Sequence, residues 1–467
     1  NKFLFWFACL ESPAMEEPKE NFEENSTPHC PPSNRGINMP SEGSFNSMNS
    51  LNNHAHNDGL HEVSRLTFGT SIIMLCNIMI GSGILNQGQV FSDAGIIGTT
   101  VLYILAFCMI WLGSVALIEA AEALNLKGTQ LDFSYLASIT HGKKGSNLAD
   151  GSIVMLNFMA NLSYILLIST LASSLLQYWS GNETLILFKP YFLAVVFTIF
   201  FIFPGCLARH FTNMPSFAYM GLTCTTLVML VVFIYGPPDG KKYRAMDETI
   251  VMWDWGQMFR KSGSVIFALG FTAASFHVYL GISPRNVKEW KKTLTLGLFF
   301  GAAACYSTGI VGYLSFRSAT SGNILDNFDG VLAQIATILV IVHLIWYTPM
   351  EFVILRHSFF QLCGMEPLKV PFKLHWMVTA LLLSLMVFIC IVLDGTGVDS
   401  GDAFGVILDL SGGIGGAISC FILPAMIYRR AKSDGYLNVP CKILFGFGIF
   451  MAVSVPISTV IDFSYGE

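Results

Sequence analysis

Apolar segments of roughly 20 residues follow one another along most of this chain, separated by short polar stretches. A helix needs about 20 apolar residues to cross the hydrocarbon core of a bilayer, so each segment predicts a membrane-spanning helix. The pattern therefore predicts an all-α polytopic membrane protein with eleven transmembrane helices. The predicted spans are 67–90, 95–122, 151–179, 190–208, 215–235, 262–282, 294–316, 331–355, 374–393, 402–427 and 443–461.

The first 65 residues differ from the rest, because they are rich in Asn, Ser, Pro and Glu and show no helical or strand periodicity. Such a segment cannot bury enough apolar surface to fold alone. We expect a disordered cytosolic tail over 1–65, followed by a transmembrane domain over 66–463. The chain begins with Asn1 rather than Met, which suggests a fragment or an uncertain gene start.

The positive charges predict the orientation, since cytoplasmic loops retain Lys and Arg. With the N-terminus in the cytosol, most of the 26 lysines and arginines lie on the cytoplasmic side. The same topology places the sequon Asn182-Glu183-Thr184 in an outer loop, so we expect glycosylation at Asn182. Plasma membrane and vacuolar or lysosomal membrane both fit. The basic residues predicted outside are Lys189, Lys241, Lys242, Arg244, Arg260, Lys261 and Arg317.

Composition narrows the class of protein. Hydrophobic residues make up 53% of the chain and charged residues 12%, against about 25% charged in a soluble domain. With a net charge of −5, this excludes a soluble enzyme and a nucleic-acid-binding protein. The eleven cysteines form no Cys-x-x-Cys pair, so neither a disulfide framework nor a metal site is predicted, and no cofactor is expected. A transporter, channel or receptor remains, and a membrane enzyme is disfavoured because catalytic fingerprints are missing.

The first span contains a candidate break. Asn77 precedes Gly81-Ser82-Gly83 by one helical turn in an otherwise apolar run. Two glycines around a serine allow a helix to unwind, which frees amide N–H groups for a carboxylate and carbonyls for a cation. The alternative is that the small residues allow close helix packing.

Two further spans carry polar residues. The sixth has Gly, Thr and Ser near its middle, and it would match the first span if spans one to five and six to ten were inverted repeats. In the eighth, His343, Tyr347 and Glu351 recur every four residues and share one helical stripe. A proton relay along this stripe is one interpretation. The other has His343 hydrogen-bonded in the core and Glu351 wetted and paired with Arg356.

Four stretches, taken together, resemble the amino acid/auxin permease family, closest to its sodium-coupled neutral amino acid transporter branch. The resemblance covers essentially the whole membrane region. The stretches are Asn77 to Leu85 with Ala94-Gly95, Phe203-Pro204-Gly205 with Arg209, Tyr347-Thr348-Pro349-Met350-Glu351 through Arg356, and Leu410-Ser411-Gly412-Gly413 through Phe421 to Tyr428.

The resemblance implies a LeuT-like fold of 5+5 inverted repeats plus one extra helix, which moves amino acids by alternating access. It places a cation at Asn77, with Thr348 as a weaker second ligand. It also places the substrate's carboxylate and amino groups at the unwound segment. The implied substrate-binding residues are Gly81, Ser82, Gly83, Phe267, Thr272 and Ser275; the implied coupling residues are Asn77 and Thr348, beside the stripe of His343, Tyr347 and Glu351.

This sequence departs from the family pattern at several positions. It reads Asn86-Gln87 where a Leu-Pro pair is usual, and Phe271-Thr272 in place of a Cys-His pair. We therefore expect a secondary active transporter of neutral amino acids, coupled to sodium or to protons. The expected partners are an amino acid and the bilayer, and no nucleic acid is expected. The sequence does not define the oligomeric state. The alternatives are a non-transporting amino-acid sensor or scaffold and, third, a channel.

Overall fold

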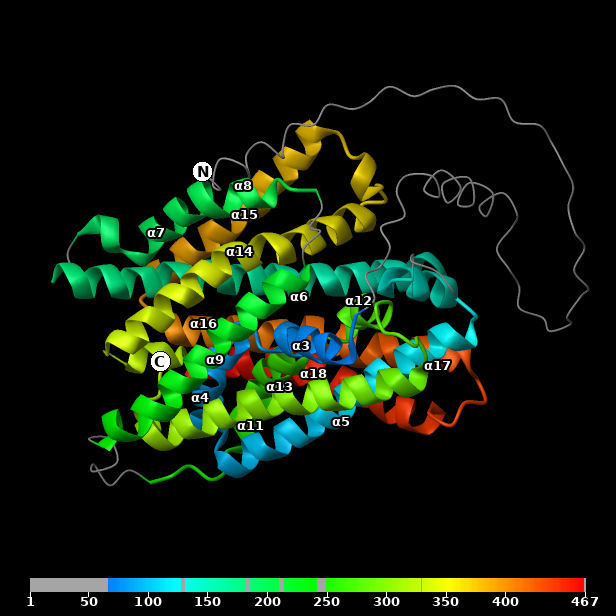
Figure 1. The fold of residues 1–467 in the computed structure, drawn as a ribbon, viewed down its shortest axis with the longest axis horizontal. Coiled ribbons are helices and arrows are strands. Elements are labelled where there is room, and N and C mark those ends of the chain that lie inside the picture. Colours follow the sequence, from blue (N-terminus) through cyan, green and yellow to red (C-terminus); the bar gives the residue numbers. More distant parts are fainter. Residues whose placement is uncertain are drawn as a thin grey trace, which may run out of the picture. The chain divides into compact units, whose positions relative to one another are not determined.

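The computed structural model describes residues 66–126, 131–181, 185–209, 214–241, 249–328 and 330–465. All of them belong to the second of two compact units, Val63–Glu467. The described residues are almost entirely helical, and their one isolated β-bridge joins Leu66 to Ile282 (Figure 1). The tail over 1–65 and the sequon at Asn182 lie outside the described residues.

The helices follow the predicted apolar segments in order. The first five segments are α3 (Phe68–Met79) with α4 (Gly83–Ala94), α5 (Ile96–Ala123), α6 (Phe133–Ser180), α7 (Pro190–Phe197) with η2 (Thr198–Ile202) and α8 (Phe203–Cys206), and α9 (Met214–Asp239). The next five are α11 (Trp255–Leu269) with η3 (Thr272–Ala274) and α12 (Ser275–Tyr279), α13 (Val287–Phe316), α14 (Val331–Leu362), α15 (Phe372–Gly395), and α16 (Ser400–Leu410) with η7 (Ser411–Gly416), η8 (Ile418–Ile422) and α17 (Leu423–Ala431). The last is α18 (Asn438–Tyr465).

Within the described part, nine helices are long and apolar enough to cross a bilayer, and the bent pair α3 and α4 makes ten. The remaining predicted segment, the fourth (190–208), corresponds to a shorter apolar helix, Pro190–Cys206. The polytopic helical fold is therefore confirmed, whereas the count of eleven stays a prediction.

Several helices begin earlier than the sequence predicts, and two of them, α6 and α11, change the picture. α6 begins at Phe133 rather than near residue 151, and its helical φ/ψ angles are interrupted at Gly142. α11 begins at Trp255, capped by Asp254, so Arg260 and Lys261 lie inside a helix and not in an outer loop as predicted. The loop prediction was wrong because it read these charges as exposed, whereas the Lys261 side chain is 1% exposed and ion-paired.

Corresponding helices of the two halves pack on each other. α4, which belongs to the first span of the first half, packs against α11, which belongs to the first span of the second half. The third members, α6 and α14, also pack along each other. These two pairs fit the predicted arrangement of two five-helix repeats.

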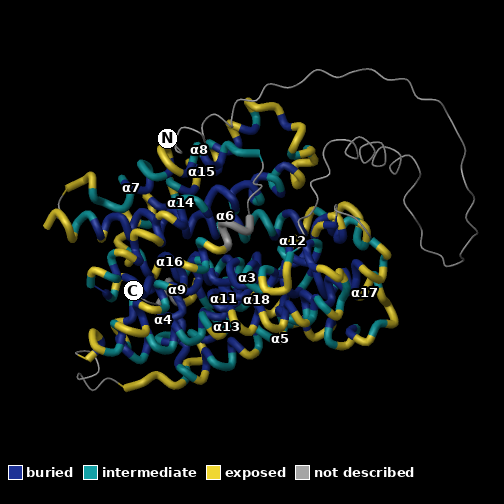
Figure 2. The backbone as a smooth tube through the Cα atoms, in the orientation of Figure 1, coloured by how far each residue is buried: buried dark blue, intermediate teal, exposed yellow. Residues whose placement is uncertain are grey.

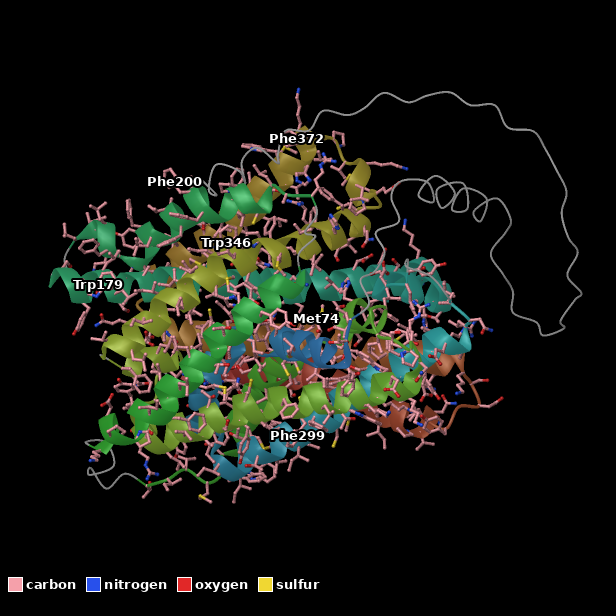
Figure 3. The ribbon with its side chains drawn as sticks, in the orientation of Figure 1. Met74, Trp179, Phe200, Phe299, Trp346 and Phe372 are labelled. Atoms are coloured by element: carbon pink, nitrogen blue, oxygen red, sulfur yellow. The ribbon has the colours of Figure 1, made fainter. Side chains whose placement is uncertain are left out.

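Burial separates the interior helices from the perimeter. α11 and the α16–α17 span are the most buried, while α18 is the least buried of the long spans (Figure 2). Large apolar side chains cover the outside of the helices, among them Phe200, Phe299 and Phe372, which are 69%, 57% and 62% exposed (Figure 3). So much exposed apolar surface fits contact with lipid rather than with water.

Candidate functional site

The first span is broken where the sequence predicts. α3 and α4 meet at a bend of 58°, and the three residues between them are Ile80, Gly81 and Ser82. The freed carbonyl of Ile80 accepts a hydrogen bond from the Thr225 hydroxyl of α9 at 3.3 Å. Backbone groups released by the break are thus partly satisfied by a neighbouring span.

The two glycines of the motif have different surroundings. A β-carbon on Gly83 would lie 3.0 Å from both Cα and Cβ of Ala268, so α11 packs directly against the backbone at Gly83. A β-carbon on Gly81 would meet only the Tyr164 hydroxyl, at 4.0 Å. Both interpretations of the motif therefore apply, with close packing at Gly83 and an open break at Gly81.

The sixth span is also interrupted. α11 ends at Leu269, Gly270 adopts an extended conformation, and a short 3₁₀ turn leads into α12. Since Ala268, just before this break, packs on Gly83, just after the other, the two breaks lie side by side. The two interrupted helices are therefore paired, as expected if the first and sixth spans occupy matching places in two repeats.

A small cavity lies at the first break. Gly81 and Ser82 line it from the break, and α9 and α14 supply the rest of the wall. The predicted site lies between spans one, six and eight, whereas this cavity lies between spans one, five and eight. The polar or reactive side chains contributed by the two walls are those of Cys224, Thr225 and His343.

Three spans meet at Asn77. Asn77 is 7% exposed in the last turn of α3. A β-carbon on Gly221 of α9 would lie 2.1 Å from Asn77 Oδ1 and 2.8 Å from His343 Cε1. Both side chains therefore pack closely against this glycine. His343 Nδ1 is buried and has no hydrogen-bond partner among the described residues. An amide oxygen and an unsatisfied imidazole nitrogen thus lie beside the cavity.

The stripe on the eighth span is continuous. The ring of His343 stacks on that of Tyr347 with 5.3 Å between centroids, and Tyr347 packs edge-on against Tyr164 of α6 at 5.8 Å. The Tyr347 hydroxyl pairs with Glu351.

Arg356 has different partners from those proposed in the alternative interpretation. Its guanidinium donates to the Ala208 carbonyl at 2.7 Å, to the Thr379 hydroxyl at 2.9 Å and to the Cys206 carbonyl. Arg356 therefore caps the end of α8, and among the described residues it makes no ion pair with Glu351.

The remaining predicted residues are more scattered. Phe267 lies against Gly83, since a β-carbon there would be 3.4 Å from its ring. The Thr272 hydroxyl is 3.2 Å from that of Ser114 on α5, away from the cavity. Thr348 is fully buried, and its hydroxyl donates to the Leu344 carbonyl at 2.6 Å.

Ser275 is fully buried, and its hydroxyl has no hydrogen-bond partner in the described part of the chain. Sequence reasoning missed the contribution of α9, where Gly221, Cys224 and Thr225 face the break. The available signal was the cluster of hydroxyl residues at 223–226 inside an apolar run. It also missed Tyr164, whose hydroxyl approaches the break at Gly81.

A multi-span helical bundle with two adjacent interrupted helices and a small cavity at one break has the architecture of a membrane transporter. The family model described as transmembrane amino acid transporter protein matches residues 64–460. The chain therefore belongs to this family of amino acid transporters.

Individual relatives agree with this assignment. The chain is 23% identical over 410 residues to the vacuolar amino acid transporter 2 of Saccharomyces cerevisiae, covering 83% of this chain and 82% of the relative. It is 23% identical over 404 residues to human solute carrier family 38 member 10, covering 85% of this chain but only 35% of that relative's length. These relatives are transporters and carriers rather than enzymes, which supports the predicted non-enzymatic function.

Solved structures share the fold. A mutant of the Eremococcus coleocola manganese transporter matches with a TM-score of 0.51 at 10% identity, covering 86% of this chain and 90% of that one. At this identity the likeness shows the arrangement of helices alone. The predicted transporter fold and amino acid transport are thus confirmed, while the coupling ion stays a prediction.

Proposed function

We propose that this protein is a secondary active transporter of neutral amino acids, driven by a sodium or a proton gradient. The observation that carries the proposal is the cavity at the broken first span, which Gly81, Ser82, Thr225 and His343 line. The amide N–H groups at the break bind the substrate carboxylate, because a helix N-terminus such as that of α4 favours negative charge. Ion and substrate together stabilise a closed state that reopens on the other side of the membrane.

Asn77 binds a coupling cation in this proposal, with Thr348 as a weaker ligand. The Asn77 oxygen lies near the cavity, since it shares Gly221 with the cavity residue His343. Thr348 still has free lone pairs, because its hydroxyl acts as the donor to the Leu344 carbonyl.

A proton is the other candidate, and one observation favours it. His343 carries a ring nitrogen without a hydrogen-bond partner among the described residues, beside the cavity. Its ring stacks on that of Tyr347, whose hydroxyl pairs with Glu351. An imidazole nitrogen without a hydrogen-bond partner is a proton acceptor, so in this proposal His343 receives the proton from the cavity side.

The proposed membrane is vacuolar, lysosomal or plasma membrane, with the N-terminus in the cytosol and glycosylation at Asn182. The positive-inside distribution of Lys and Arg supports the orientation. The yeast relative named as a vacuolar transporter supports an internal membrane.

The test is uptake of a panel of labelled amino acids into proteoliposomes under a sodium gradient, a pH gradient or neither. Accumulation above equilibrium with one gradient establishes secondary active transport and identifies the ion. His343→Gln should abolish pH-driven accumulation, while His277→Gln, at an exposed position on α12, should preserve it. Folded protein that accumulates nothing under any gradient would overturn the proposal in favour of a sensor.

A further inference from the structure

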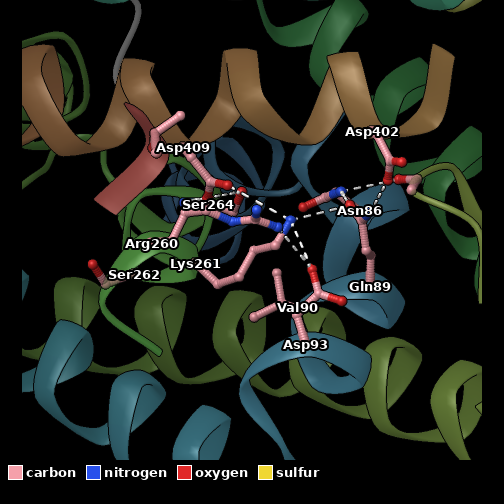
Figure 4. Close-up of polar contacts among 12 residues, drawn as sticks. Asn86, Gln89, Val90, Asp93, Arg260, Lys261, Ser262, Ser264, Asp402 and Asp409 are labelled. Carbon is pink, nitrogen blue, oxygen red and sulfur yellow. Dashed lines mark hydrogen bonds and ion pairs between the residues drawn. The ribbon is translucent and has the colours of Figure 1, made fainter. Parts of the chain in front are cut away.

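A cluster of buried charges joins three helix segments on the α4 side of the breaks. Lys261 of α11 is 1% exposed, and its ammonium lies 3.2 Å from Asp93 Oδ2 and 3.2 Å from Gln89 Oε1, both on α4 (Figure 4). The same ammonium lies 3.6 Å from Asp409 Oδ2 on α16, a carboxylate that is fully buried. Lys261 therefore connects the outer parts of the first, sixth and tenth spans.

The cluster is balanced in charge. Arg260 donates to Asp93 Oδ2 at 3.1 Å, so the two cations of α11 face one carboxylate on α4 and one on α16. Asp409 Oδ1 also accepts hydrogen bonds from the backbone N–H and the hydroxyl of Ser264, at 3.0 and 2.6 Å. Two cations and two carboxylates need no external ion in this arrangement.

A polar chain extends the cluster toward α16 and the loop before α14. Gln89 donates to Asp402 Oδ1 at 2.5 Å, while Asn86 donates to Gln89 at 2.8 Å and to the Gly322 carbonyl at 3.1 Å (Figure 4). Gln89 follows Leu85 by one helical turn, and Leu85 lines the cavity at the break. The cluster thus lies just beyond the cavity along α4.

Stability alone gives little reason for such a cluster. Burying ions costs several kcal/mol each, and apolar residues of the same volume often stabilise a protein as well or better. Charged side chains, unlike apolar ones, are well solvated when water reaches them. Charged residues therefore suit a contact between helices that is closed in one state of the protein and exposed to water in another, whereas apolar residues do not.

We propose that Lys261, Asp93 and Asp409 form an access gate, which seals the cavity on the α4 side while paired and opens that side when the pairs separate. This inference rests on the proposed function only in taking the cavity at Gly81 and Ser82 as the transport site. Lys261 is the central group, since it contacts both other helices. It acts on access to the site and makes no contact with the substrate.

Cys224 reports on the gate without any transport measurement. It lines the cavity, and it is buried. The experiment measures the modification rate of Cys224 by a membrane-impermeant maleimide, supplied to sealed vesicles on the face where α4 ends and read by peptide mass spectrometry. Cys224→Ser supplies the blank.

The main variant is Lys261→Met combined with Asp409→Asn, because it leaves Arg260 paired with Asp93 and no orphan charge. We expect its Cys224 modification to rise at least about fivefold, the low end of typical coupling between two states. Lys292→Met is the matched control, because it removes the same group from an exposed pair with Glu289. That control should leave the rate unchanged.

An unchanged rate in the folded double variant would overturn the gate. Thermal stability of the double variant, compared with the wild type, shows whether the protein is folded. Because labelling and uptake are separate readouts, a raised rate in a protein that transports nothing would retain the gate and reject the proposed function. Normal uptake by a double variant whose Cys224 labelling rate is unchanged would reject the gate and retain the proposed function.

Discussion

The side-chain amide oxygen of Asn77 lies so close to Gly221 that a β-carbon on the glycine would be 2.1 Å from it. The contact joins the last turn of α3 to α9, directly beside His343 of α14. The position of Asn77 therefore depends on a glycine in a span that sequence reasoning left without a role.

Gly221→Ala should displace Asn77 and lower the apparent affinity for the coupling ion about tenfold, equivalent to about 1.4 kcal/mol. Ion dependence of uptake in proteoliposomes measures this effect. Gly446→Ala on α18 is the control, because a β-carbon there meets no atom within 4 Å. Equal ion dependence in both variants would show that Gly221 does not position Asn77.

Asn77→Ala should reduce gradient-driven uptake while leaving the amount of protein in the membrane unchanged, since it removes the proposed oxygen ligand without adding bulk. The reduction should be about tenfold or more if the amide binds the ion. Uptake and quantitative immunoblotting of the same membranes give both values. Full coupled uptake in this variant would remove Asn77 from the site.

The two glycines at the break should respond differently to alanine. Gly83→Ala forces a methyl group against the backbone of α11 at Ala268, which should destabilise the protein by about 1–3 kcal/mol through overpacking. Gly81→Ala has space, so its melting temperature should match the wild type. Thermal unfolding in detergent compares them, and equal melting temperatures would contradict the close packing at Gly83.

Arg356 should be needed for stability rather than for coupling. Arg356→Met leaves the carbonyls of Cys206 and Ala208 without their donor, at a cost of about 1–3 kcal/mol for each buried unsatisfied group. Arg429→Met, near the end of α17, serves as the control. A lower melting temperature with unchanged ion dependence is expected; altered ion selectivity would instead tie Arg356 to Glu351.

Segment length and local composition predicted much of this fold. The apolar runs located every helical segment, though not every helix start, and Gly81-Ser82-Gly83 located the break, because both signals are local in the sequence. The start of α11 was missed for a physical reason. The partners of Lys261 are 168 and 148 residues away in the sequence, and nothing in its immediate sequence shows that Asp93 and Asp409 neutralise it.

The same limit applies to the site. Periodicity predicted the stripe of His343, Tyr347 and Glu351, whose members do adjoin one another. It could not show that the Thr272 hydroxyl turns toward Ser114 on α5, or that Gly221 lies between Asn77 and His343. Such contacts depend on how spans that are distant in the sequence pack together, which local sequence patterns do not reveal.

The short helix Pro190–Cys206 should make the protein sensitive to the thickness of its bilayer. Seventeen helical residues rise about 26 Å, less than the roughly 30 Å of a typical hydrocarbon core. The chain just after this helix is held by two arginines. Arg356 donates to the Ala208 carbonyl, and Arg209 donates to the carbonyls of Leu368 and Val370. These hydrogen bonds oppose a shift of the helix along the membrane normal. We therefore expect the bilayer to thin beside α7 and α8, and we expect a membrane of short acyl chains to match this side of the protein best.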